Sequence, residues 1–271
     1  MRWLLVCIVA WLASGISYAQ DSQPVVMPDV ARLENYNAIT LWNEGINALP
    51  PETARMTQIW HLDLSSNTFT EFPLVLTELP TLVKLTFTHN LLTELPPQFG
   101  DLPAVEEIDL SHNSLSELPP QIGNLATLTK LTVQYNQLTT LPPEIGNLEN
   151  LYMLNLGENH LRELPPEIGN LDNLWGLWIA DNDLTSLPIE IGGLPNLAWI
   201  NVERNPLMTM SPYAELRYND AILSYLQEQY ALAQRTKQSL LVMTGALGAG
   251  VLALAGLIWR RRRPRRKKKH A

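Results

Sequence analysis

The sequence predicts an α/β solenoid, in which parallel strands line the concave face of an arc, a helix caps the C-terminal end, and one transmembrane helix follows. Three observations predict this architecture. The central part of the chain repeats at a fixed period of 23 residues. An amphipathic stretch follows the last copy, and a long uncharged stretch follows that one. Stacked repeats bury their apolar residues only against neighbouring copies, so the end of the stack needs a cap.

The composition and the distribution of charge exclude several classes of protein. The chain has 271 residues, of which 46% are hydrophobic, so a packed core is expected rather than disorder. All 27 acidic residues lie within residues 21–228, and nine of the 19 basic residues lie within the last twelve positions. The central part is therefore strongly acidic. Such a body repels nucleic acid and anionic membranes, so we predict no nucleic-acid partner.

Residues 1–19 predict a secretory signal peptide that is cleaved after Ala19. The segment has a short basic start, an apolar run over residues 3–13, and small residues at Ser17 and Ala19. An uncleaved anchor is the alternative, but the apolar run is short for a membrane span. Cys7 is the only cysteine, so the mature chain would have no thiol for a disulfide, a metal site or a nucleophile.

Residues 238–259 predict a transmembrane helix. The uncharged run over residues 239–259 would extend about 31 Å as a helix, which matches the thickness of a bilayer core. The basic residues within 260–271 place this end in the cytoplasm, because positive charges stay on the cytoplasmic side. A basic run can also indicate nucleic-acid binding or nuclear import, but directly after a span it is typical of a stop-transfer signal. We therefore predict a type I single-pass protein of the plasma membrane, with the repeats outside.

Small residues recur at helical spacing within the predicted span, at Gly245, Ala249, Ala253 and Gly256. Such a face can pack against a second helix, which indicates a possible homo-oligomer. A plain lipid anchor rich in glycine and alanine is the alternative.

Residues 36–207 contain eight copies of the repeat in register. The copies follow the approximate pattern LxxLxLxxNxLxxLPxxIGxLxx, and they begin at Tyr36, Ile59, Leu82, Val105, Leu128, Leu151, Leu174 and Leu197. The fourth and sixth positions, such as Leu154 and Leu156, alternate with other residues and predict a short strand with one buried face. An asparagine recurs where seven of the eight strands end, and a buried amide there can bond the backbone of its own coil and of the adjacent coil. Glu44 replaces it in the first copy, which is therefore expected to be an irregular cap.

The second half of each copy predicts a convex segment, as in the two LPPEIGNL stretches at 141–148 and 164–171. Its prolines favour polyproline II geometry, and Gly146 and Gly169 are expected to permit a tight turn. Residues 20–35 are an N-terminal lead-in. Residues 208–237 form the predicted helical cap and juxtamembrane segment, in which Ile222, Leu226 and Tyr230 recur at helical spacing.

The pattern over residues 36–207 resembles the leucine-rich repeat family in a membrane-anchored surface form. The run NPL followed by AILSYL is similar to the segment that closes 23-residue repeats of this type. The resemblance implies that the side chains between the strand leucines project from the concave face. They would form columns about 4.8 Å apart from coil to coil.

The aromatic and acidic second half of this face is the predicted ligand-binding surface. Tryptophan on a rigid sheet contributes a large contact area with little loss of side-chain entropy, so it is typical of interaction hot spots. Trp178 lies between the apolar Leu177 and Ile179 and is expected to point to the face. Trp175 and Trp199 have the alternative role of shielding the end of the stack. The predicted surface consists of Tyr135, Tyr152, Trp175, Trp178, Trp199, Glu158, Asp181 and Arg204.

We predict noncatalytic recognition of a protein, a peptide or a glycan at the cell surface. No catalytic triad order, phosphate loop or metal-ligand spacing is visible, so we predict no catalytic residue and no cofactor. His89 and His112 share a column near Asp109, but neutral histidines on a polar sheet are common, and we predict no metal. Two alternatives remain: a self-associating structural protein of the envelope, and a co-receptor that signals through a partner.

Overall fold

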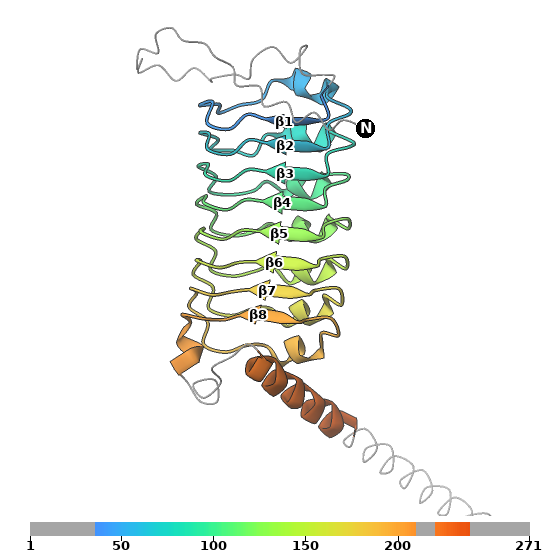
Figure 1. Ribbon diagram of the computed structural model, residues 1–271, viewed down its shortest axis with the longest axis vertical. Helices are drawn as coiled ribbons and strands as arrows, with labels where there is room; N and C mark the ends of the chain where they lie inside the picture. The colour runs from blue at the N-terminus through green and yellow to red at the C-terminus, as the bar shows by residue number, and fades with distance from the viewer. Residues whose placement is uncertain (1–35, 210–219, 239–271) are drawn as a thin grey trace, which may run out of the picture.

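The computed structural model describes residues 36–209 and 220–238 and shows eight coils stacked in chain order (Figure 1). Each coil contributes one strand of three residues, and the strands form a single parallel sheet in the order β1 to β8. This confirms the predicted solenoid of parallel strands. The strands are β1 (Ala38–Thr40), β2 (His61–Asp63), β3 (Lys84–Thr86), β4 (Glu107–Asp109), β5 (Lys130–Thr132), β6 (Met153–Asn155), β7 (Gly176–Trp178) and β8 (Trp199–Asn201).

The strands pair without any shift in register. Residues 23 apart in sequence are partners throughout, so Lys84 pairs with Glu107 and Asn155 pairs with Trp178. The middle residue of each strand is buried, and in most strands its two neighbours are partly exposed. The third and fifth positions of the repeat therefore form continuous columns on one face of the sheet, as predicted.

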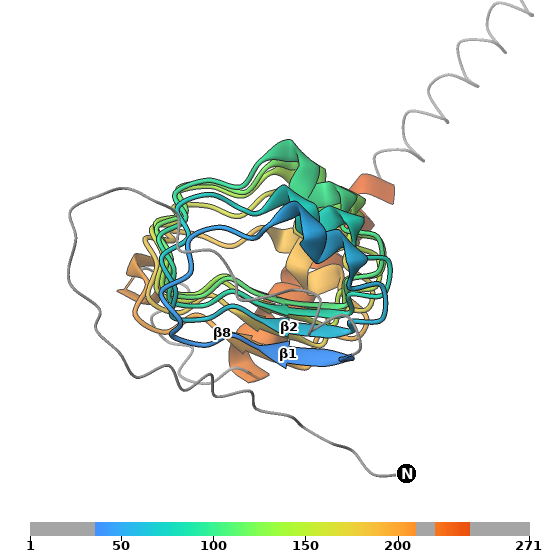
Figure 2. The same cartoon turned by 90° about the horizontal axis from the view of Figure 1, so that it is seen from above.

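Short 3-10 helices line the side opposite the strands in the first seven coils (Figure 2). In the regular coils the first proline of the pair is extended, as for Pro142 with φ −68° and ψ 141°, and Pro143 opens the helix. Proline suits the first helical position because its missing N–H has no partner there. These helices are η2 (Pro51–Arg55), η3 (Leu74–Glu78), η4 (Pro97–Asp101), η5 (Pro120–Asn124), η6 (Pro143–Asn147), η7 (Pro166–Asn170) and η8 (Ile189–Gly193), and η9 (Pro206–Thr209) follows the last coil.

The repeated glycines have a different role from the expected one. Gly45 is the glycine with positive φ among the described residues, so Gly146 and Gly169 do not need a left-handed turn. A Cβ at Gly146 would lie 2.4 Å from the carbonyl oxygen of Glu167 in the next coil. Glycine is present because neighbouring 3-10 helices touch backbone to backbone at this point.

The interior combines a leucine core with a ladder of buried amides. Asn136 donates through Nδ2 to the carbonyl oxygens of Leu110 and Val133, each at 3.1 Å. Its Oδ1 accepts a hydrogen bond of 3.0 Å from the backbone N–H of Leu115. One amide thus joins its own coil to the preceding one, as predicted. The ladder consists of Asn67, Asn90, Asn113, Asn136, Asn159, Asn182 and Asn205, all of them buried.

Residues 220–238 are helical and pack against η8, the 3-10 helix of the seventh coil. Ile222 and Leu226 are buried and join the same core as the repeats. A Cβ at Gly192 in η8 would lie 2.2 Å from the carbonyl oxygen of Leu226, so the helix backbone lies directly against η8. The contact places this helix at the end of the stack, where a cap is needed.

Several predicted segments lie outside the described residues. They are the signal peptide at 1–19, the lead-in at 20–35, the basic tail at 260–271, and the predicted span at 238–259 apart from its first residue. The row of small residues from Gly245 to Gly256 falls within that span. Among residues 36–209 and 220–238, no helix has both the length and the apolar character needed to cross a bilayer.

Candidate binding surface

The eighth position of every coil adopts a left-handed backbone conformation. The φ angles lie between 53° and 58°, a region that residues with a Cβ rarely enter. Because every coil turns in the same way, these side chains form one row beside the ends of the strands. We call this row the eighth-position column; it consists of Asn43, Ser66, His89, His112, Tyr135, Glu158, Asp181 and Arg204.

Side chains at the fifth position help to hold the chain as it leaves the strand. Asp109 accepts a hydrogen bond of 3.0 Å from the backbone N–H of Ser111 through Oδ1. Asn155 accepts the equivalent bond of 3.1 Å from Gly157. Aspartate and asparagine form such local turns readily. The same bond occurs at Asp63 and at Asn201.

The predicted surface divides into two groups, of which the first is an aromatic cluster. We define the aromatic cluster as Tyr152, Trp175, Trp178 and Trp199. The rings of Tyr152 and Trp175 are stacked, with centroids 5.6 Å apart and an interplanar angle of 10°. Trp175 and Trp178 meet at 6.4 Å and 50°. Trp199 lies beside them, because it is the sheet partner of Gly176 on β7.

Exposure differs among the members of this cluster. Trp178 projects from the sheet face at the fifth position but is only partly exposed. Tyr152, Trp175 and Trp199 are 47%, 37% and 44% exposed, so neither Trp175 nor Trp199 is covered by the C-terminal helix. Tyr152, Trp175 and Trp199 therefore offer more ring surface to a ligand than Trp178 does, although Trp178 was the tryptophan predicted to face a ligand without an alternative role.

The second group belongs to the eighth-position column and contains Tyr135, Glu158, Asp181 and Arg204. Tyr135 does not join the tryptophans but stacks on His112 at 4.2 Å and 11°, and His112 stacks on His89 at 4.0 Å and 9°. We call these three rings the His–Tyr stack. It results from the shared backbone conformation, which places planar side chains of adjacent coils face to face.

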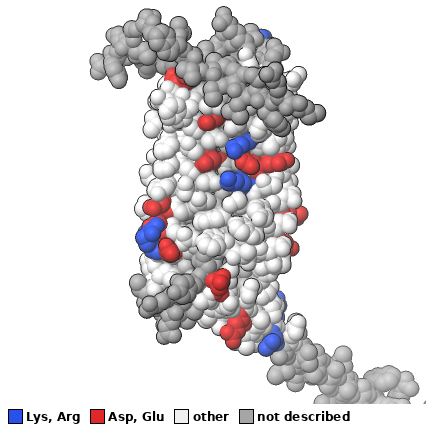
Figure 3. All heavy atoms as spheres, in the orientation of Figure 1, with Lys and Arg blue, Asp and Glu red and all other residues white. Residues whose placement is uncertain are grey.

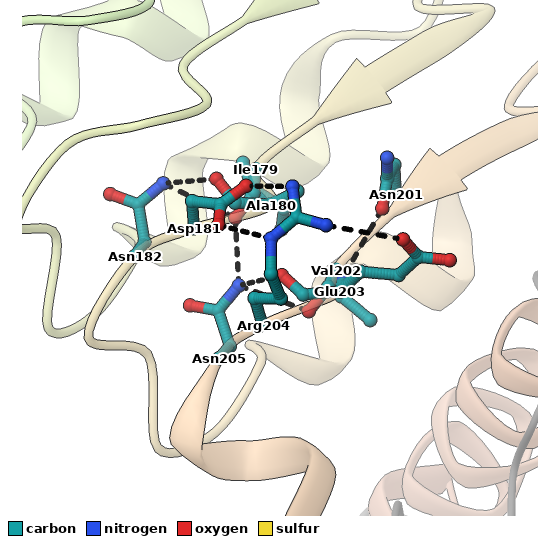
Figure 4. Close-up of polar contacts among 9 residues, drawn as sticks. All are labelled: Ile179, Ala180, Asp181, Asn182, Asn201, Val202, Glu203, Arg204 and Asn205. Atoms are coloured by element: carbon teal, nitrogen blue, oxygen red, sulfur yellow. Dashed lines mark hydrogen bonds and ion pairs between the residues drawn. The ribbon is translucent and has the colours of Figure 1, made fainter.

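Arg204 and Asp181 bind each other on the last two coils (Figure 4). The guanidinium donates through Nε and Nη2 to the two carboxylate oxygens of Asp181. This bonding holds the pKa of Asp181 below its ordinary value. Two of the charged residues predicted to bind a ligand are thus engaged with each other.

Charge is distributed unevenly over the sheet face. Figure 3 shows charged side chains gathered over the upper strands, whereas the face over β6 to β8 is largely free of them. In the charged part, Lys84 Nζ lies 3.2 Å from Glu107 Oε2. The third and fifth positions of β6 to β8 are all uncharged, namely Met153, Asn155, Gly176, Trp178, Trp199 and Asn201. The aromatic cluster therefore lies on an uncharged surface.

Two histidines of the face have altered acidity. Burial lowers the pKa of His112, the neighbouring His89 lowers it further, and Asp109 opposes the shift. Burial and Lys84 lower the pKa of His61. Among the described residues, no group of three or more histidine, cysteine, aspartate or glutamate side chains is arranged to hold a metal ion.

Two exposed tryptophans were missed by the sequence reasoning. Trp60 is 40% exposed and occupies the second position of its coil, as Tyr152 and Trp175 do in theirs. A reading of the second-position column would have found it. Trp42 is 58% exposed at the seventh position of the first coil, where most other coils carry small residues.

Comparison with known proteins agrees with this geometry. A family model described as leucine rich repeat matches residues 80–138, 126–184 and 149–207. No curated protein matches the sequence. Among solved structures, a leucine-rich repeat protein of Leptospira interrogans is 35% identical, with a TM-score of 0.63, and the match covers 65% of this chain and 45% of that chain.

Two further solved structures are similar. The Arabidopsis receptor kinase HAESA, in complex with the peptide hormone IDA and the co-receptor SERK1, is 29% identical with a TM-score of 0.57, over 65% of this chain and 31% of that chain. Internalin C2 of Listeria monocytogenes is 23% identical with a TM-score of 0.60, over 69% and 79%, and shares the fold. The chain thus spans less than half of the Leptospira protein and about a third of the plant receptor chain.

Proposed function

We propose that the repeats, of which residues 80–207 match the leucine rich repeat family model, bind a protein or peptide through the sheet face of β6 to β8. The observation that carries the proposal is the aromatic cluster on an uncharged surface. Monomeric proteins rarely expose several large aromatic side chains together unless that surface is used for binding. The role is noncatalytic recognition.

The geometry of the cluster favours an extended polypeptide as the ligand. Tyr152, Trp175 and Trp199 are exposed on neighbouring coils, so a segment running along the stack contacts all three. Aromatic rings of this kind contribute most of the binding energy in many protein interfaces. The HAESA receptor was solved with a peptide hormone, which supports a peptide or protein ligand over a glycan.

We also propose that the repeats are displayed outside the cell and anchored by residues 238–259. The uncharged run over 239–259 and the basic residues that follow it support this placement. The expected outcome is that the chain stays with membranes after alkaline carbonate washing and that protease added to intact cells removes the repeats. Release by carbonate, or full protection from protease, would contradict the proposal.

Site-specific crosslinking tests the binding role. A photoreactive amino acid at position 175 of the full chain, irradiated on cells, is expected to yield a crosslinked protein partner. The matched control carries the same group at position 60, because Trp60 has the same place in its coil and similar exposure but lies in the charged half. Crosslinking at 175 that disappears with Tyr152→Ala supports the proposal. Equal crosslinking at both positions would remove the aromatic cluster from consideration.

A further inference from the structure

Coil 2 contains a buried hydroxyl group that the fold does not use. Ser65 is 5% exposed, and within the described part of the chain its Oγ has no hydrogen-bond partner. Nearly all buried polar groups are paired, because an unpaired one costs about 1–3 kcal/mol. This Oγ is closed to solvent and beyond the reach of a ligand, so it matters through the neighbouring Asp63, whose carboxylate it does not bond.

Coil 4 shows how the same pair of residues satisfies itself. Ser111 stands two residues after Asp109, as Ser65 stands two residues after Asp63. In coil 4 the Ser111 hydroxyl donates to Asp109 Oδ1 at 2.5 Å, in addition to the backbone bond. In coil 2 only the backbone bond is present, from Ser65 N–H to Asp63 Oδ1 at 2.9 Å. Coil 2 thus keeps a hydroxyl and a carboxylate that do not satisfy each other.

The same coil is a gap in the row of planar side chains. One face of the His89 ring is covered by His112 at 4.0 Å, and the opposite face is directed toward coil 2. The eighth position of coil 2 is Ser66, which is too small to cover that face, and His89 is exposed. On the other side, Trp42 of coil 1 is exposed in the same column as Ser65. A planar group can therefore extend the His–Tyr stack by one coil.

The ring face of His89 and the carboxylate of Asp63 favour a planar cation as the ligand in this gap. A guanidinium stacks on an aromatic ring and donates to a carboxylate at the same time, whereas an ammonium is not planar. Asp63 supplies the carboxylate, and Lys84 on the adjacent coil is engaged with Glu107 rather than with Asp63. The chain itself forms such a pair between Arg204 and Asp181, across adjacent coils.

We propose that coil 2 binds an arginine side chain of a protein partner. The guanidinium stacks on His89 above Ser66, and the partly exposed carboxylate of Asp63 accepts its hydrogen bonds. This site is separate from the aromatic cluster, since coil 2 and coil 7 are about 24 Å apart along the stack at the usual strand spacing. Either site can therefore fail without the other.

The test is a titration of the full chain with N-acetyl-Gly-Arg-Gly-amide, followed by the NMR signals of labelled histidines. We expect the His89 signals, assigned from the His89→Asn variant, to shift with this peptide and not with its lysine counterpart. Asp63→Asn should weaken binding about tenfold to a hundredfold, the usual effect of losing a hydrogen bond to a charged group. Asparagine keeps the local turn, because Asn155 accepts the same backbone bond in coil 6.

Two matched variants make the outcome decisive. Asp109→Asn in coil 4 should leave the affinity unchanged, because Ser111 already occupies that carboxylate. Ser66→Trp should abolish binding, because the indole fills the gap above His89. Equal affinity for the arginine and lysine peptides, an equal loss in Asp109→Asn, or retained binding in Ser66→Trp would each overturn the proposal. An unshifted His89 signal at saturating peptide would do so as well.

Discussion

The indole of Trp178 lies over Gly176, two residues earlier on β7, so closely that a Cβ at position 176 would come within 2.5 Å of the ring. Both residues belong to the same face of the sheet, where a larger side chain at the third position would push the ring outward. The glycine therefore determines how much of Trp178 is open to solvent, and with it the shape of the aromatic cluster.

Gly176→Ala should change the cluster more than it changes the fold. The added methyl group meets the far end of a side chain rather than the backbone, so Trp178 can move away. We expect less than about 1.5 kcal/mol of destabilisation, in the range of tolerated changes in packing. Acrylamide quenching of tryptophan fluorescence should increase. Unchanged quenching would show that the ring keeps its place.

The glycines of the 3-10 helices should be far less tolerant. Gly146→Ala places a methyl group 2.4 Å from a backbone oxygen of the next coil, and we expect about 1–3 kcal/mol of destabilisation in urea unfolding. Gly157→Ala is the matched control, because a Cβ there would be no closer than 3.4 Å to its neighbours. That variant should be neutral or slightly stabilised. Equal effects would refute the role assigned to the close contact.

The buried amide ladder should be among the most sensitive features of the fold. Asn136→Ala leaves backbone groups of Leu110, Val133 and Leu115 without their partner in the interior. We expect about 2–5 kcal/mol of destabilisation, since each buried orphan costs about 1–3 kcal/mol. Asn150→Ala is the control, because its one amide bond, to the carbonyl of Ala126, is exposed. A similar loss in both variants would argue against the ladder.

Acidification should destabilise the repeats through His112. Its pKa is lowered in the folded protein, so the unfolded chain binds more protons as the pH falls. The stability is therefore full above about pH 6.5, the ordinary value, and declines as the pH falls through the lower folded value. His112→Asn should reduce the dependence of Tm on pH in this range. An identical slope in both proteins would contradict the expectation.

Two other groups also make stability depend on pH, one in the same pH range as His112 and one at lower pH. The pKa of His61 is lowered as well, so part of the slope should remain in His112→Asn and disappear when His61→Asn is added. The pKa of Asp181 is also lowered. A lowered carboxylate pKa stabilises the fold at pH values above 3.8, the ordinary pKa of this group. That contribution is lost only at lower pH, so it does not overlap the histidine range.

The sequence was sufficient to predict the strands, their register and the amide ladder. These features depend on periodic residue types, because a period of 23 without insertion permits only one alignment of the coils. It did not predict why Gly146 recurs, because glycine also serves turns, and only the packed coils show the approach of Glu167. Close contact between distant segments leaves no local pattern.

The candidate surface was predicted only in part, for a similar reason. The columns placed Trp178 and Trp199 on the face, but how far each ring is exposed depends on small neighbours such as Gly176. The left-handed eighth position was not predicted, because its residues share no chemical type. The stacking of Tyr135 on His112 follows from that backbone conformation, so it also required the structure.

The unbroken register makes the coils interchangeable in their backbone but not on their surface. Deleting residues 105–127 would remove one whole coil and bring β3 and β5 together in the same register. Lys84 would then face Lys130 where it now faces Glu107, so two cations would meet in place of an ion pair. In the charged half of the molecule, alternating charge therefore specifies the order of the coils. The hydrogen bonds of the sheet are the same in any order and could not specify it.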